Sequence, residues 1–191
     1  MTLVPAPLAH GDSPPTDALS NRRRFLQWAA LGGGAMLWRR LHAETAHGET
    51  PAAHAIEALL LSCMDYRLID DITQYMDARG LTNQYDHIVL AGASLGALAK
   101  NFKDWNQTFW EHLKISIELH HIASVILMDH RDCGAYKMLL KADFSKDPVL
   151  EERVHGKYLR ELAQAIVKRY PKLEVETLLM NLDGTVQTIT S

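Results

Sequence analysis

Two short segments of this sequence carry side chains that bind transition metals. Cys63 is followed by Asp65 and Arg67, and about 60 residues later His130 is followed by Cys133. Thiolate sulfur and imidazole nitrogen favour zinc over magnesium or calcium. Two cysteines and one histidine leave a fourth, exchangeable position, which is a known composition for a catalytic zinc site. If the fold brings them together, these side chains therefore predict a zinc centre.

The residues beside the cysteines allow more than one interpretation. The carboxylate of Asp65 can supply a fourth oxygen ligand, and Arg67 can compete for that carboxylate with a bidentate clamp. Alternatively, Asp65 and Arg67 form a plain ion pair at the start of a helix. Cys63 and Cys133 could instead form a disulfide, although a disulfide has no need of a neighbouring histidine, aspartate or arginine.

The elements that must position these residues follow from the pattern of apolar residues. Apolar runs predict four buried strands, helical spacing predicts helices between them, and Asp183-Gly184 predicts a turn into a short last strand. The strands are expected at 56–61, 87–91, 124–128, 173–180 and 185–189, and the helices at 68–76, 105–121 and 149–166. This order predicts an α/β fold: a mostly parallel sheet of about four strands with helices on both faces, plus a short terminal strand, in the order 2-1-3-4.

Both metal-binding segments follow the carboxyl end of a predicted strand. In an open α/β sheet, ligands bind in the crevice outside these ends. If the first and third strands are neighbours, Cys63 faces His130 and Cys133. Asp132 lies between the last two and is expected to support a ligand or to cap the next helix.

Composition sets limits on the function. The 191 residues hold 20 Lys and Arg against 23 Asp and Glu, a net charge of −3, which excludes a generic basic nucleic-acid binder. With 47% hydrophobic residues the chain can bury a core, and two cysteines are too few for a disulfide framework.

The amino-terminal residues differ from the rest of the chain. Three arginines at 22–24 precede Phe-Leu and a short, glycine-containing apolar run at 28–38, which is the layout of an export signal. The arginines resemble the twin-arginine signal. We therefore expect an export signal at 1–43, a linker at 44–54 and one domain at 55–191. The protein is then expected to meet the twin-arginine export machinery and to be periplasmic or otherwise exported.

Taken together, Cys63-x-Asp65-x-Arg67 and His130-x-x-Cys133 resemble the zinc signature of the β-class carbonic anhydrases. The resemblance covers residues 56–189. It implies that the two cysteines and the histidine bind zinc, and that Asp65 is either a fourth ligand in a closed state or is held by Arg67 in an open state. The implied activity is carbonate dehydratase, the reversible hydration of carbon dioxide to bicarbonate by zinc-bound hydroxide, with Asp65 and Arg67 as catalytic residues. A homodimer or higher homo-oligomer is also implied.

Two alternatives keep the same metal site. The enzyme could act on a related heterocumulene, carbonyl sulfide or carbon disulfide, because residues 89–93 read Val-Leu-Ala-Gly-Ala where the family commonly has Arg-Asn-Ala-Gly-Asn. The protein could also be a non-catalytic exported zinc-binding protein with a closed site of two Cys, one His and one Asp. A proton carrier for the hydration reaction would come from the histidines. The candidates are His87, His120, His121 and His155.

Overall fold

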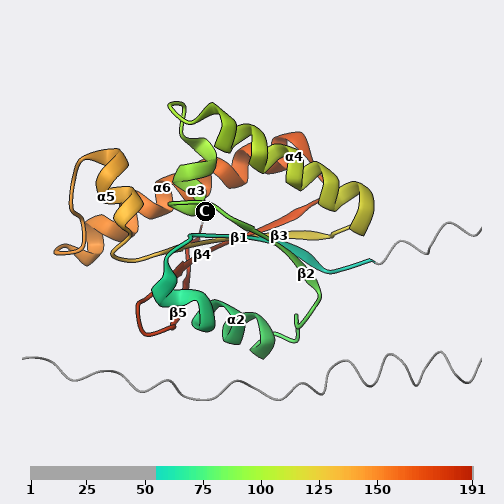
Figure 1. Cartoon of the computed structure of the whole chain (residues 1–191), viewed down its shortest axis with the longest axis horizontal. Coiled ribbons are helices and arrows are strands. Elements are labelled where there is room, and N and C mark those ends of the chain that lie inside the picture. Colours follow the sequence, from blue (N-terminus) through green and yellow to red (C-terminus); the bar gives the residue numbers. More distant parts are fainter. Residues whose placement is uncertain (1–54, 191) are drawn as a thin grey trace, which may run out of the picture. The chain divides into compact units, whose positions relative to one another are not determined.

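A computed structural model describes residues 55–190 (Figure 1). Five strands form one sheet in the order β2-β1-β3-β4-β5. The strands are β1 (Ala58–Ser62), β2 (Tyr85–Val89), β3 (Ser124–His130), β4 (Glu174–Met180) and β5 (Val186–Thr188). All neighbours pair in parallel except β5, which runs antiparallel to β4. The predicted fold class and strand order are confirmed.

Helices cover both faces of this sheet (Figure 1). Helix α2 packs on one face, and α3, α4, α5 and α6 lie on the other. The helices are η1 (Tyr66–Leu68, a 3-10 turn), α2 (Ile69–Ala78), α3 (Ala93–Leu98), α4 (Lys103–His120), α5 (Gly134–Leu140) and α6 (Pro148–Arg169). Within residues 55–190, none of these helices is both long and apolar enough to cross a membrane.

Strand β1 lies between β2 and β3 and is buried at every position. Leu59 and Leu61 belong to the core beneath α3, α4 and α6, whereas Ala58 and Leu60 belong to the core beneath α2. A strand covered on both faces reads as a continuous apolar run. For this reason the sequence pattern predicted β1 closely.

The short helices α3 and α5 were absent from the prediction. With 6 and 7 residues, each spans fewer than two full turns, too few for a helical repeat of apolar residues to stand out, and neither begins with a capping side chain. Helix α3 follows Gly92, whose left-handed φ of 74° turns the chain out of the strand that precedes it. Both helices begin beside the metal-binding segments, so they matter for the site. The predicted export signal (1–43) and linker (44–54) lie outside the described residues.

Candidate metal centre

The fold brings the three predicted metal ligands together. Cys63 directly follows β1, His130 ends β3, and Cys133 precedes α5. Since β1 and β3 are paired neighbours, their carboxyl ends lie side by side. The ligand atoms of the three residues all lie within 4.8 Å of one another.

The two cysteines are free thiols in the structure. Their sulfur atoms lie 3.9 Å apart, far beyond the S–S bond length of about 2.05 Å. Two sulfurs that each lie about 2.3 Å from one tetrahedral centre would be about 3.8 Å apart. The spacing of Cys63 and Cys133 is therefore that of a metal site rather than of a disulfide.

The orientation and hydrogen bonding of His130 also suit a metal ligand. Its Nδ1 lies 2.8 Å from the backbone carbonyl oxygen of Arg131 and donates to it, so Nε2 keeps the lone pair. Nε2 is buried and has no hydrogen-bond partner among the described residues. A buried nitrogen without a partner is costly, and a metal ion held with the two sulfurs would satisfy it. The residues at this site thus fit a bound zinc ion.

Electrostatics already favour one thiolate in this cluster. The hydrogen bond from the Cys133 thiol lowers the pKa of Cys63 to about 4, with further help from His130 and from the backbone N–H of Gly92, which lies 3.3 Å from the sulfur. The same hydrogen bond, together with burial, raises the pKa of Cys133. Burial opposes the charged form of His130, but the Cys63 thiolate outweighs it and raises the pKa of the imidazole.

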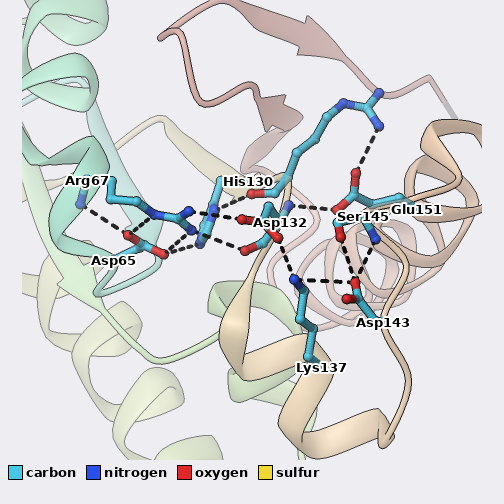
Figure 2. Close-up of polar contacts among 9 residues, drawn as sticks. Asp65, Arg67, His130, Asp132, Lys137, Asp143, Ser145 and Glu151 are labelled. Carbon is cyan, nitrogen blue, oxygen red and sulfur yellow. Dashed lines mark hydrogen bonds and ion pairs between the residues drawn. The ribbon is translucent and has the colours of Figure 1, made fainter.

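Asp65 and Arg67 form the bidentate pair that the sequence suggested (Figure 2). Nε and Nη2 of Arg67 donate to the two carboxylate oxygens of Asp65 at 2.9 and 2.8 Å. These bonds lower the pKa of Asp65 to about 2. Oδ2 of Asp65 lies 3.8 Å from Nε2 of His130, so the carboxylate stands beside the metal ligands while Arg67 holds it. Asp65 also accepts a bond from the backbone N–H of Arg67 and caps η1, so the bidentate contact and the helix cap are both present.

Of the residues that surround this pair, the sequence had pointed only to Asp132, whereas Lys137 and Glu151 were not predicted. Asp132 contacts both Arg67 and Lys137, and its backbone N–H donates to the buried carboxylate of Glu151 (Figure 2). Of the two roles suggested for Asp132, support of the site or a helix cap, the contact with Arg67 therefore favours support of the site. The residue before α5 is Cys133, and it makes no side-chain cap. No sequence spacing links Glu151, in the first turn of α6, to the loop after β3.

A second buried cluster, centred on Asp129, lies behind the metal ligands. The Asp129 carboxylate is 1% exposed and accepts hydrogen bonds from the backbone of Ser94 (3.0 Å), from Nδ1 of His155 (3.0 Å) and from the hydroxyl of Tyr136. It joins β3 to α3, α5 and α6. This cluster was not predicted. The signal that could have indicated it is Asp129 itself, a charged residue in an apolar strand directly before the ligand His130.

The structure separates the four histidines considered as proton carriers. His155 is buried against Asp129, and His120, at the end of α4, bonds to Asp86 at 2.7 Å. His121 follows α4 and precedes β3, so it lies with His120 at the opposite end of the sheet from the metal ligands. His87 and His155 each contact the residue before a ligand, but of these two only His87 is exposed, with its Nε2 2.7 Å from the hydroxyl of Ser62, the residue before Cys63.

Comparison with known proteins agrees with this site. Residues 53–190 match the family described as "Putative carbonic anhydrase". The chain belongs to this carbonic anhydrase family. The predicted membership of a carbonic anhydrase family is thereby confirmed.

The chain is also similar to two uncharacterized bacterial proteins in sequence and to a solved structure in fold. An uncharacterized protein of Rickettsia bellii is 37% identical over 131 residues, which cover 69% of this chain and 80% of the relative. A second, from Rickettsia conorii, is also 37% identical over 131 residues and is covered to 70% of its length. The β-carbonic anhydrase CafD of Aspergillus fumigatus shares the fold with a TM-score of 0.50 and 11% identity, over 82% of this chain and 95% of CafD.

Proposed function

We propose that this protein is a zinc-dependent carbonic anhydrase that hydrates carbon dioxide reversibly to bicarbonate. The observation that carries the proposal is the buried Nε2 of His130, which has no hydrogen-bond partner within residues 55–190 and lies beside the sulfurs of Cys63 and Cys133. Membership of a carbonic anhydrase family adds independent support.

In this proposal Cys63, His130 and Cys133 hold the zinc ion. When bound, zinc would act as a Lewis acid and lower the pKa of a water molecule far below its ordinary value. The chain's own task is to keep the fourth position open. Arg67 does this by holding both oxygens of Asp65, which leaves Asp65 ionised and able to accept a hydrogen bond at the reacting centre.

We propose His87 as the proton carrier. It is exposed on the edge strand β2 and contacts Ser62, which precedes the ligand Cys63. Burial of part of its ring lowers the pKa of His87, so the neutral form that accepts a proton prevails at neutral pH. Replacement His87→Ala should reduce kcat, with partial rescue by added imidazole buffer, and leave zinc content unchanged.

The test of the proposed function is zinc analysis together with stopped-flow hydration of carbon dioxide, using the full chain. We expect one zinc per chain and hydration well above the buffer rate. Cys63→Ser should remove both, whereas Lys114→Ala, a replacement on the exposed surface of α4, should change neither. A protein that carries zinc but does not hydrate carbon dioxide above the buffer rate would overturn the proposal, and turnover of carbonyl sulfide in its place would favour the heterocumulene alternative.

One observation keeps the closed, non-catalytic zinc site as the second candidate. Oδ2 of Asp65 is only 3.8 Å from Nε2 of His130, so a small rotation would bring it to a metal held by that nitrogen. In that case zinc would be bound with Asp65 as its fourth ligand. Azide, an anion that needs an open fourth position on the metal, would then fail to bind at any pH.

We further propose that the chain forms a homodimer or higher homo-oligomer. Three apolar side chains beside the candidate site are exposed: Met64 (65%), Tyr66 (82%) and Ile69 (60%). Strand β2 also leaves one edge of the sheet unpaired among the described residues. Light scattering after gel filtration tests this, and Tyr66→Ser should shift the protein toward the monomer.

Export by the twin-arginine pathway is also a proposal. It rests on the arginines at 22–24 followed by Phe-Leu and the short apolar run. Replacement of Arg22 and Arg23 by Lys should retain the protein inside the cell, with the folded domain unchanged. Export of the doubly replaced protein at the normal level would contradict this.

A further inference from the structure

We propose that Asp132 is a positioning residue that fixes Arg67 in the place where it keeps Asp65 off the metal. This inference rests on the proposed function, because it concerns the same site and its fourth coordination position. It adds a second carboxylate to the Asp65–Arg67 pair and gives that pair a fixed support.

Arg67 is held from two sides by different donor atoms (Figure 2). Nε and Nη2 face Asp65, whereas Nη1 donates to Oδ2 of Asp132 at 2.9 Å. Nη2 also donates to the backbone carbonyl of Asp132 at 3.1 Å. Since the two carboxylates bond to different N–H groups, Asp132 does not remove a bond from Asp65.

Asp132 is itself fixed by its surroundings. Its φ of 56° is in the left-handed region, which an aspartate tolerates better than most residues. Its N–H donates to Oε1 of Glu151 at 2.6 Å, and its Oδ1 accepts from Nζ of Lys137. Glu151 is 4% exposed, and its other oxygen, Oε2, lies 3.4 Å from Nη1 of Arg131. The support therefore extends to the buried carboxylate of Glu151, in the first turn of α6.

Without the Asp132 carboxylate, the long side chain of Arg67 would be held by Asp65 and by the backbone carbonyl of residue 132 only. The Arg67 side chain is 34% exposed, so its free rotamers would compete with the bidentate pair. An exposed ion pair of this kind changes an equilibrium by about two- to fivefold. We therefore expect Asp132→Asn to release Asp65 toward the metal by about that factor.

The test uses the full chain loaded with Co²⁺ and titrated with azide, followed by the visible absorption of the metal. Azide needs the fourth position, so it competes with Asp65. Removing a negative charge nearby also strengthens azide binding, whatever the position of Asp65. A double-mutant cycle separates the two effects, with Asp132→Asn made in the native chain and in the Asp65→Asn background.

For each background we take the ratio of the azide dissociation constant after Asp132→Asn to that before it. We expect this ratio to be about two- to fivefold larger in the native chain than in the Asp65→Asn background, which means weaker azide binding when Asp65 is present. Asp143→Asn is the matched control, because Asp143 bonds to Lys137 at 3.3 Å and not to Arg67, and it should show no coupling to Asp65. Arg67→Ala should show the largest coupling.

The inference would be overturned if Asp132→Asn changed the azide dissociation constant equally with and without Asp65. It would also be overturned if Asp132→Asn weakened azide binding less when Asp65 is present than when it is replaced. Asp132→Gly suits the same left-handed backbone and should repeat the result if the asparagine variant folds poorly. A native chain that takes up no Co²⁺ with thiolate-to-cobalt absorption would refute the proposed function and this inference with it. A loaded native chain without coupling would refute only the inference.

Discussion

Replacing Asp129 by Asn should strongly destabilise the fold. The carboxylate accepts three buried hydrogen bonds, from the backbone of Ser94, from Tyr136 and from His155. An asparagine side chain offers one oxygen and turns an NH2 group toward groups that also donate. At least one donor and this NH2 group would then be buried without partners.

The size of the effect follows from that count. Each buried polar group left without a partner costs about 1–3 kcal/mol, so we expect the two groups left unpaired in Asp129→Asn to lower the free energy of unfolding by about 2–6 kcal/mol. Tyr136→Phe removes one donor and should cost about 1–3 kcal/mol. Urea denaturation of the metal-free protein is the appropriate assay, since bound metal would add its own stabilisation.

Asp86→Asn provides a matched control for this measurement. Asp86 accepts from a serine and a histidine, Ser116 at 2.6 Å and His120 at 2.7 Å, but its side chain is 31% exposed. Water can replace these partners, so the loss should be about 1 kcal/mol or less. If Asp129→Asn cost no more than this control, the cluster would not hold α3, α5 and α6 to β3 as inferred.

Three further predictions follow from the same structure. Gly96→Ala should cost several kcal/mol by urea denaturation, because an added Cβ would collide with the carbonyl oxygen of Ala91, whereas Gly134→Ala meets nothing within 4 Å and should be neutral; equal costs would contradict the packing of α3. The pKa of Asp65 is lowered to about 2, so its contribution to stability is present above about pH 4 and is lost as the pH falls toward 2; the acid-induced loss of unfolding free energy over this range should shrink in Arg67→Ala, and an unchanged loss would be evidence against the ion pair. Removing the metal with a chelator should lower the melting temperature, and adding zinc back should restore it; no change in melting temperature would argue against a bound ion.

Much of the fold could be predicted from the sequence because the sheet is covered on both faces. Strand β1 is buried throughout, so an apolar run marked it, and the parallel order then placed Cys63 beside His130. The three ligand positions and the Asp65–Arg67 contact followed from that order and from the resemblance to the β-class enzymes.

The support of the site could not be predicted in the same way. Glu151 and Asp129 act through single contacts with residues distant in sequence, and such contacts leave no periodic pattern. Helices α3 and α5 are too short to show one. His155 was one of the candidate proton carriers, but it is buried and bonds to Asp129. Its burial depends on how α6 packs on the sheet, which the sequence does not show.

X-ray absorption at the zinc edge of the purified full chain tests the proposed metal centre most directly. The site of Cys63, His130 and Cys133 predicts two sulfurs at about 2.3 Å and nitrogen or oxygen neighbours at about 2.0–2.1 Å. A sulfur-free zinc environment, or a protein that carries no zinc and in which the two cysteines no longer react as thiols, would contradict it.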